Sequence, residues 1–436
     1  MRFTVEELKK ATDAKLDGGR DGSFEISTDT RTIKKGDIYL PLKGANFDGE
    51  NFCSKALDAG AVGCFCTKDN KLDGICLKVS DTLSAYLKIA SYARQKYNPI
   101  VVAITGSSGK TTTKEMVYSV LSEKFKAHKT YSNHNNEIGF CQTVLSMPED
   151  TEVLIVEMGM RGFGEIELIC KYALPDYAII TNAGSAHIGR LGSLDNIAKA
   201  KCEVTKYLKN MLIANDNNRI RKFADFDGEK IFYSIDSVKI LEKRSGYSKF
   251  VYKEKAYELN VDGDYNIENS LSAIELAYKL GMSYDEIKRG LASYHPIEKR
   301  WEVQNIKGMS VINDSYNANP ESMKASVSTF LELYENPVVV LGDMGELGDD
   351  EAEFHRQVGE YLGEKFKGKK ILFLTVGKLS KYICDELLKY GFDVKHFDNN
   401  IETSRYILDN LHEGITIFLK ASRAMKFEEI IENLKN

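Results

Sequence analysis

Short runs of apolar residues, separated by segments of helical length, recur along most of the chain. Between residues 81 and 308 such runs occupy 100–104, 153–156, 177–180 and 211–214, and the segment 83–97 has apolar residues about 3.6 positions apart. Continuous apolar runs that alternate with amphipathic helices are typical of a parallel sheet covered by helices on both faces. The pattern predicts an α/β domain with a doubly wound parallel sheet over residues 81–308.

A second series of the same kind follows. Its apolar runs occupy 311–312, 338–341, 371–376, 394–397 and 415–419, with helices expected at 351–366 and 380–390. This series predicts a separate Rossmann-like domain over residues 309–436. The first 80 residues have shorter runs broken by Gly and Asp clusters, which predict a small mixed α/β domain over residues 1–80.

The composition agrees with three domains and narrows the class of protein. The chain has 436 residues, against a typical domain size of about 150. Its 59 Lys and Arg residues against 64 Asp and Glu residues give a formal charge of −5, which argues against a nucleic-acid-binding protein but not against small anionic ligands. The eight cysteines form no CxxC pair, and no segment resembles a signal peptide or membrane helix. We therefore expect reduced core thiols, a cytoplasmic location and no membrane partner.

A glycine-rich segment follows the expected strand at 100–104. The segment reads TGSSGKTTT over residues 105–113 and leads into a helical pattern. Glycines let the backbone N–H groups of such a loop point at phosphate oxygens, Lys110 adds a positive charge, and the Thr111 hydroxyl can bind Mg²⁺. The alternative is a plain glycine turn before a helix. The strand, loop and helix together favour ATP binding by Gly106, Ser107, Ser108, Gly109, Lys110, Thr111 and Thr112.

This loop and several later blocks resemble those of the ATP-dependent Mur ligases, which build the peptide stem of bacterial peptidoglycan. The later blocks are NHNNEIG (133–139), VEMG (156–159), TNAGSAH (181–187), IAKAKCE (197–203), KRW (299–301), NDSYNANP (313–320), LGDMGELG (341–348) and KASRAM (420–425). The last three look like those of members that join D-alanyl-D-alanine to UDP-N-acetylmuramoyl-tripeptide. Mild departures from the family pattern are Tyr265, Asn313, Ala421 and Ala424.

The resemblance implies a reaction in which ATP converts a substrate carboxylate to an acyl phosphate, which the amine of the dipeptide then attacks. It implies catalytic roles for Lys110, Asn136, Glu157, His187, Lys201 and Arg300. Lys110 and Arg300 suit the γ-phosphate, one as a point charge and the other as a planar fork. Two Mg²⁺ ions are implied, one bound by Thr111 and Glu157, the other by His187 and a CO₂-derived carbamate on Lys201.

The resemblance also implies binding residues in all three domains. Asn266 and Asn269 are expected beside the adenine of ATP, and Asp314 beside its ribose. The incoming peptide is expected at Asn317, Asn319, Ser422 and Arg423. The uridine diphosphate of the other substrate is expected at Ser27, Asp29, Arg31, Gly44, Asn46, Phe47 and Asp48. These partners are small molecules, and we expect a monomer.

Each residue also has a simpler interpretation. Lys201 can be a solvated helix lysine, His187 a structural histidine and Asn136 a loop residue. Asn266 and Asn269 can be helix caps, and Asp29 with Arg31 a surface ion pair. For the whole chain, the alternatives are the family member that adds the third amino acid, a folylpolyglutamate-type ligase, or a nucleotide switch. The sequence does not distinguish lysine from diaminopimelate in the acceptor peptide.

Overall fold

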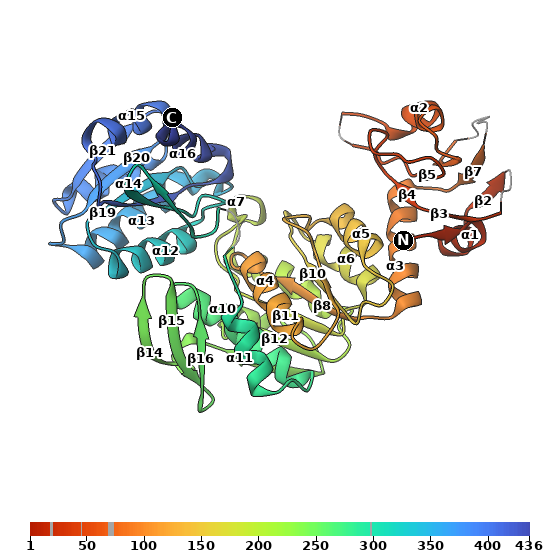
Figure 1. The fold of residues 1–436 in the computed structure, drawn as a ribbon, viewed down its shortest axis with the longest axis horizontal. Coiled ribbons are helices and arrows are strands. Elements are labelled where there is room, and N and C mark those ends of the chain that lie inside the picture. Colours follow the sequence, from red (N-terminus) through yellow and green to blue (C-terminus); the bar gives the residue numbers. More distant parts are fainter. Residues whose placement is uncertain (18–20, 45, 69–73, 297–298) are drawn as a thin grey trace.

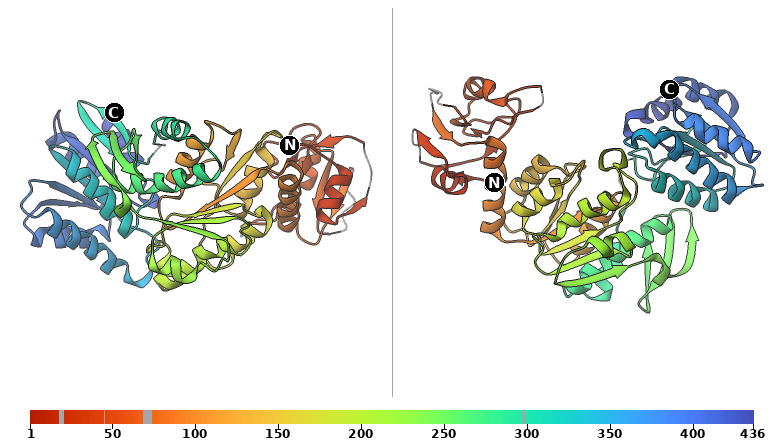
Figure 2. Two further views of the ribbon diagram at one scale, coloured as in Figure 1. Left: turned by 90° about the horizontal axis from the view of Figure 1, so that it is seen from below. Right: turned by 180° about the vertical axis from the view of Figure 1, so that it is seen from behind.

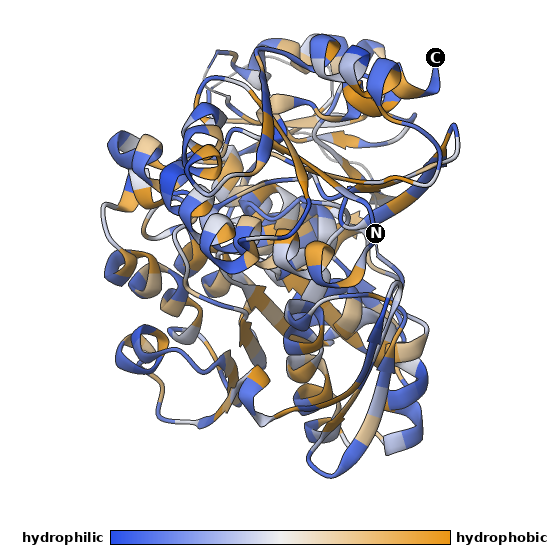
Figure 3. Ribbon diagram, turned by 90° about the vertical axis from the view of Figure 1, so that its left-hand side faces the viewer, coloured by the Kyte–Doolittle hydropathy of each residue, from blue (hydrophilic) through white to orange (hydrophobic). Residues whose placement is uncertain are grey.

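The computed structural model describes residues 1–436 except 18–20, 45, 69–73 and 297–298. Three α/β domains follow one another along the chain, and the N- and C-terminal domains rise from opposite ends of the central one (Figures 1 and 2). Apolar residues gather on the strands and on the inward sides of the helices (Figure 3). The predicted three-domain α/β architecture is confirmed.

The N-terminal domain contains a mixed five-stranded sheet. Its order is β2 (Lys15–Asp17), β7 (Ile75–Lys78), β6 (Gly63–Cys66), β5 (Ile38–Tyr39) and β4 (Ile26–Ser27), parallel except for the β2–β7 pair. The remaining elements are β1 (Phe3–Thr4), which pairs with β3 (Ser23–Phe24), and the helices α1 (Val5–Thr12), η1 (Gly49–Phe52) and α2 (Cys53–Asp58). Helix α1 begins with a capping box between Thr4 and Glu7.

The central domain has a six-stranded parallel sheet. Its order is β13 (Glu229–Tyr233), β12 (Met211–Asn215), β11 (Tyr177–Ile180), β8 (Ile100–Thr105), β10 (Val153–Glu157) and β9 (Ala127–Lys129). On β8, Val101 and Ala103 enter one hydrophobic core, whereas Val102 and Ile104 enter another. Because both faces of the sheet are buried at its centre, the four inner strands appear in the sequence as continuous apolar runs, whereas the edge strands β9 and β13 do not.

Helices surround this sheet. They are α3 (Thr82–Tyr97), α4 (Lys110–Leu121), α5 (Glu137–Ser146), α6 (Glu165–Ala173), α7 (Ile188–Leu191), α8 (Leu194–Cys202), η2 (Glu203–Thr205), α9 (Asn218–Phe223), η3 (Ile235–Ser237), α10 (Asp264–Lys279) and α11 (Tyr284–Ala292). Helix α3 contacts both α1 and α5, so it lies between the N-terminal and central domains.

The sequence pattern did not indicate a three-stranded antiparallel sheet beside the central domain. It consists of β14 (Lys239–Arg244), β15 (Tyr247–Tyr252) and β16 (Lys255–Leu259). Only one face is buried, where Phe250 and Tyr257 join the core below. Polar residues alternate with these apolar ones, so no continuous apolar run marks the strands.

The C-terminal domain has another six-stranded sheet. Its order is β17 (Glu302–Ile306), β18 (Met309–Asn313), β22 (Thr416–Lys420), β19 (Pro337–Gly342), β20 (Leu372–Val376) and β21 (Asp393–Phe397), parallel except for the β17–β18 pair. Its helices are α12 (Pro320–Leu333), η4 (Gly348–Asp350), α13 (Glu351–Phe366), α14 (Ser380–Lys389), α15 (Asn400–Asn410), η5 (Arg423–Met425) and α16 (Glu428–Lys435). Strand β17 belongs to this sheet but lies before the domain boundary expected between residues 308 and 309. The sequence pattern did not indicate this strand, because its alternating residues form no apolar run.

All eight cysteines are free and buried, as predicted. Within the described residues, no helix combines the length and the hydrophobicity that a membrane crossing requires.

A buried carboxylate joins the central and C-terminal domains. Asp262, just after β16, accepts hydrogen bonds from Trp301 Nε1 at 2.9 Å and from the Tyr334 hydroxyl at 2.7 Å. The Trp301 ring packs on Phe418 of β22, with 5.2 Å between ring centroids. Burial raises the pKa of Asp262 although these donors lower it. Oδ1 of this carboxylate accepts from the Tyr247 backbone N–H at 3.2 Å, whereas Oδ2 depends on donors that the C-terminal domain and its linker supply.

We expect Trp301→Phe to lower the free energy of unfolding by about 1–3 kcal/mol, because it deprives a buried carboxylate of a donor. The midpoint of urea unfolding, followed by circular dichroism, measures this effect; fluorescence is unsuitable because Trp301 is the only tryptophan. Ser245→Ala, which removes an exposed partner of the Tyr334 hydroxyl, is the control. Equal midpoints for Trp301→Phe and the wild type would contradict the anchoring role of Asp262.

Candidate active site

A cavity of about 970 Å³ lies between the central and C-terminal domains. Its lining includes the loop after β8, the end of β10, residues of α10 and loops of the C-terminal sheet. In open parallel sheets, ligands bind beyond the carboxyl ends of the strands, and the central strands of this sheet end at the cavity.

The glycine loop connects β8 to α4 in a conformation that requires glycine. Gly106 has φ +152° and Gly109 has φ +76°. A Cβ atom on Gly106 would lie 1.9 Å from Thr181 Oγ1, and one on Gly109 would lie 2.7 Å from Asn269 Oδ1. The Asn182 side chain accepts hydrogen bonds from the backbone N–H groups at residues 107 and 108, at 3.1 and 3.0 Å. The loop is thus held against the end of β11.

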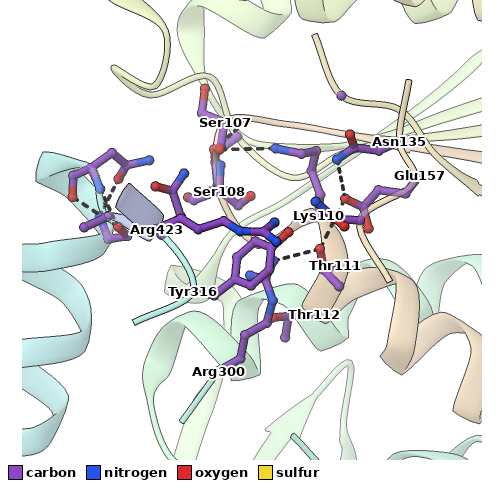
Figure 4. A pocket seen from close by; sticks show the side chains of 18 of the residues that line it. Ser107, Ser108, Lys110, Thr111, Thr112, Asn135, Glu157, Arg300, Tyr316 and Arg423 are labelled. Atoms are coloured by element: carbon purple, nitrogen blue, oxygen red, sulfur yellow. Dashed lines mark hydrogen bonds between the residues drawn. The ribbon is translucent and has the colours of Figure 1, made fainter. Parts of the chain in front are cut away.

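Lys110 begins helix α4 and folds back over the loop. Its Nζ donates to the carbonyl oxygen of Gly106 at 2.7 Å and to that of Ser107 at 3.3 Å (Figure 4). Burial lowers the pKa of Lys110, and the nearby Arg300 guanidinium lowers it further. A cation in this environment favours an anionic ligand.

Glu157, the last residue of β10, lies beside the loop and is 2% exposed. Its Oε1 accepts hydrogen bonds from Thr111 Oγ1 at 3.2 Å and Asn135 Nδ2 at 2.9 Å (Figure 4). The fold therefore brings together Thr111 and Glu157, the residues predicted to share a metal ion. The sequence interpretation selected Asn136, which also lines the cavity but caps α5 by accepting from the Gly139 N–H at 2.9 Å.

The donor types near the loop fit a hard cation. A threonine hydroxyl and a carboxylate are oxygen ligands of the kind Mg²⁺ prefers beside phosphates. Glu157 Oε2 is buried and has no hydrogen-bond partner among the described residues. No cluster of three or more His, Cys, Asp or Glu side chains arranged for a metal occurs in the described part of the chain. A cation here would therefore also need ligands from water or a phosphate.

Lys201 lies inside the domain and is not a solvated helix lysine. Its side chain is fully buried on α8, and its Nζ has no hydrogen-bond partner among the residues that the structure describes. Burial lowers the pKa of Lys201 well below its ordinary value, and Lys110 lowers it further. The uncharged amine is therefore favoured, and an uncharged amine can react with CO₂.

His187 lies where the two domains meet. It has φ +66°, and its Nδ1 is 2.6 Å from a carboxylate oxygen of Glu346 in the C-terminal domain. This contact lowers the pKa of Glu346. Close by, Glu321 of α12 accepts hydrogen bonds from Ser185, at 3.0 Å from the backbone N–H and 2.7 Å from the hydroxyl. These two contacts identify Glu346 and Glu321 as interdomain partners of His187 and Ser185. The sequence analysis did not predict either glutamate as a site residue.

Arg300 reaches the loop from the linker before β17. Its Nη2 donates to Thr111 Oγ1 at 3.0 Å, and its guanidinium lies 4.0 Å from the ring centroid of Tyr316. Arg423 lies 5.7 Å from the same ring (Figure 4). Tyr316 was not predicted as a site residue, although it belongs to the DSYNANP block.

The expected adenine and ribose residues also line the cavity. Asn266 and Asn269 lie within α10 and not at its N-cap, which is Gly263, so neither is the cap of this helix. Asn266 Nδ2 donates to the Asp262 carbonyl oxygen, and Asn269 lies against Gly109. The Asp314 carboxylate pairs with Lys420 Nζ at 2.6 Å.

The expected peptide residues line the C-terminal side of the cavity, whereas those expected to bind uridine diphosphate do not line it. The first group is Asn317, Asn319, Ser422 and Arg423, of which Asn319 also caps α12. The second group lies in the N-terminal domain: Ser27, Asp29, Arg31, Gly44, Asn46, Phe47 and Asp48. Arg31 pairs with Asp29 at 2.6 Å on the surface and lowers the pKa of Asp29 to about 2. The binding roles of both groups of residues stay predictions.

Models of three protein-family domains match most of the chain. They are described as "Mur ligase family, catalytic domain" for residues 25–108, "Mur ligase middle domain" for 104–277 and "Mur ligase, glutamate ligase domain" for 299–423. The UDP-N-acetylmuramoyl-tripeptide–D-alanyl-D-alanine ligase of Bacillus subtilis (strain 168) is 34% identical, covering 99% of this chain and 97% of its own length.

Two solved structures extend this similarity to the fold. A crystal structure of MurF from Acinetobacter baumannii superposes with a TM-score of 0.92 at 27% identity, covering 100% of this chain and 99% of that one. MurF ligase from Thermotoga maritima in complex with ADP has a TM-score of 0.83 at 26% identity, covering 94% and 97% of the two chains.

We expect Gly109→Ala to weaken ATP binding by at least about tenfold. The substitution adds the cost of a left-handed backbone, about 1–2 kcal/mol, and the contact with Asn269 forces the loop to move. Isothermal titration calorimetry with ATP measures the change. Gly391→Ala is the matched control, because Gly391 has φ +81° and nothing within 4 Å of an added Cβ. Equal ATP affinities for Gly109→Ala and the wild type would contradict the assignment of this loop.

Proposed function

Since the chain belongs to the Mur ligase family, we propose that it is the ATP-dependent, ADP-forming ligase that joins D-alanyl-D-alanine to UDP-N-acetylmuramoyl-tripeptide. The product is the pentapeptide precursor of peptidoglycan. The observation that carries the proposal is the convergence of three groups on Thr111. Thr111 lies in the first turn of the helix that follows the glycine loop, its hydroxyl donates a hydrogen bond to Glu157, and Arg300 donates to the same hydroxyl from the interdomain linker.

Each step of the proposed reaction brings negatively charged groups close together. A carboxylate oxygen of the tripeptide attacks the γ-phosphorus and releases ADP, and the dipeptide amine then attacks the acyl carbon and releases phosphate. Lys110 and Arg300 are the cations placed at the loop, so they reduce the repulsion between the carboxylate and ATP. Burial lowers the pKa of Lys110, and a bound phosphate would favour its charged form.

Thr111 and Glu157 would hold a Mg²⁺ ion beside the β- and γ-phosphates. When bound, the ion neutralises phosphate charge that two side-chain cations leave uncompensated. Thr111 is kept in place for this role by Arg300 as well as by Glu157.

We further propose that Lys201 carries a carbamate that faces the second cation site with His187. The neutral amine nitrogen would bond to the carbon of CO₂ and lose one proton, which replaces a buried potential cation with an anion. Lys110 lowers the pKa of Lys201 because the two cations would repel, and the same proximity favours an anion at position 201. The Nζ has no hydrogen-bond partner among the described residues, so carbamate formation would break no hydrogen bond of the amine.

The proposal assigns one substrate to each domain. Residues 1–80 bind the uridine diphosphate, 81–308 bind ATP and 309–436 bind the dipeptide. The cavity is lined from both sides by one chain, so a monomer suffices for the ATP and dipeptide sites. A nucleotide switch would not need Glu157 and His187 in the same cavity as the phosphate loop. The DSYNANP block argues against a folate ligase.

We expect phosphate release from ATP to require both UDP-N-acetylmuramoyl-tripeptide and D-alanyl-D-alanine, and to accompany pentapeptide formation. Coupled phosphate detection with mass spectrometry of the product measures this, and lysine and diaminopimelate tripeptides should be compared. Release that is indifferent to both partners would reject the ligase proposal and favour a nucleotide switch. Release with another acceptor and amino acid would favour a sibling ligase.

We expect Lys201→Ala to lose most ligation and to regain part of it in millimolar formate or acetate, because a small carboxylate can occupy the place of the carbamate. Initial rates with and without the carboxylate measure the rescue. Lys199→Ala, which removes an exposed lysine two residues earlier, should leave the rate unchanged. A folded Lys201→Ala variant that the carboxylates fail to rescue would contradict the carbamate.

A further inference from the structure

Lys114 lies one helical turn beyond Lys110 on α4, but its side chain points into the domain. It is fully buried and does not line the cavity. Its Nζ donates to the Ser132 carbonyl oxygen at 2.9 Å, and it lies 3.3 Å from Glu115 Oε1 and 3.5 Å from Glu157 Oε2. Neither the sequence interpretation nor the proposed reaction assigns it a role.

Lys114 belongs to a row of four charges of alternating sign. Lys129 on β9 contacts Glu115, which faces Lys114, which faces Glu157. The Lys129 ammonium also lies 3.9 Å from the ring centroid of Tyr118. A lysine withdrawn completely from water is costly unless anions compensate it, so its position depends on the two carboxylates.

The two oxygens of the Glu157 carboxylate have different partners. Oε1 accepts the hydrogen bonds from Thr111 and Asn135, whereas Oε2 accepts none among the described residues and faces the Lys114 charge. Lys114 also holds the Ser132 carbonyl, at the start of the loop that carries Asn135. One ammonium group thus acts on the carboxylate directly and on one of its hydrogen-bond donors through the backbone.

We propose that Lys114 is a positioning residue that fixes the orientation of Glu157 for a divalent cation bound with the nucleotide. The inference rests on the proposed function, because it assumes that the nucleotide binds at this loop. Lys114 acts through Glu157, since it has no surface on the cavity. Without it, the Glu157 carboxylate would lose the only ammonium within ion-pair distance among the described residues, and the Ser132 loop would lose a tether.

The test measures ADP binding by calorimetry, in Mg²⁺ and again in EDTA, with no peptide substrate present. For Lys114→Met, we expect the Mg²⁺-dependent gain in affinity to fall by about 10- to 100-fold, the usual effect of losing a residue that orients a metal ligand. The affinity in EDTA should stay near the wild-type value, because Lys114 does not touch the nucleotide. A residue that only packs the core would change both affinities or neither.

Two further variants separate the charge from the fold. Lys114→Met combined with Glu115→Gln removes one charge of each sign, and we expect the same loss of the Mg²⁺-dependent gain. Glu115→Gln alone leaves Lys114 facing Glu157 and should keep the gain. Thermal melting checks that each variant is folded.

Three outcomes would overturn the inference. A wild-type Mg²⁺-dependent gain in a folded Lys114→Met variant, or an equal loss in Glu115→Gln, would show that Lys114 does not position Glu157. Failure of both Lys114 variants to fold would assign the residue to stability alone. Wild-type protein that binds no ADP would instead reject the proposed function itself, so the two failures are distinguishable.

Discussion

The Glu157 carboxylate is almost completely buried at the edge of the cavity, so its charge needs compensation from neighbouring groups, and much of the site is arranged around that requirement. Thr111 and Asn135 donate to one oxygen, and Lys114 faces the other. These residues come from the helix after the glycine loop and from the loop before α5. Compensation of one carboxylate therefore holds together segments that are far apart in the sequence.

The neighbouring part of the site has an excess of basic side chains. Burial lowers the pKa of both Lys110 and Lys201; Arg300 lowers that of Lys110 further, and Lys110 lowers that of Lys201 further. The chain as a whole has a formal charge of −5, so this local excess of positive charge is a property of the cleft. An arrangement of this kind is stabilised by anionic ligands such as phosphates and carboxylates.

The position of the C-terminal domain is coupled to the same site. Asp262 accepts from Trp301 in the linker and from Tyr334 in the domain, and Arg300 precedes Trp301 directly. The contacts of Glu321 with Ser185 and of Glu346 with His187 close the other side. Any rotation of this domain about the Asp262 anchor would therefore move Arg300 relative to Thr111 and alter the charge around the phosphate loop.

The three α/β domains, the phosphate loop and the buried strands of the two six-stranded sheets could be predicted from the residues alone, whereas the edge strands β9, β13 and β17 could not. Strands buried on both faces must be continuously apolar, and the loop needs glycine at Gly106 and Gly109 for steric reasons. The antiparallel sheet at 239–259, the roles of Asn135 and Lys114, and the burial of Lys201 were decided only by the tertiary structure. A charged residue on a helix looks the same in sequence whether it faces water or a distant carboxylate, because its environment is supplied by segments that only folding brings together.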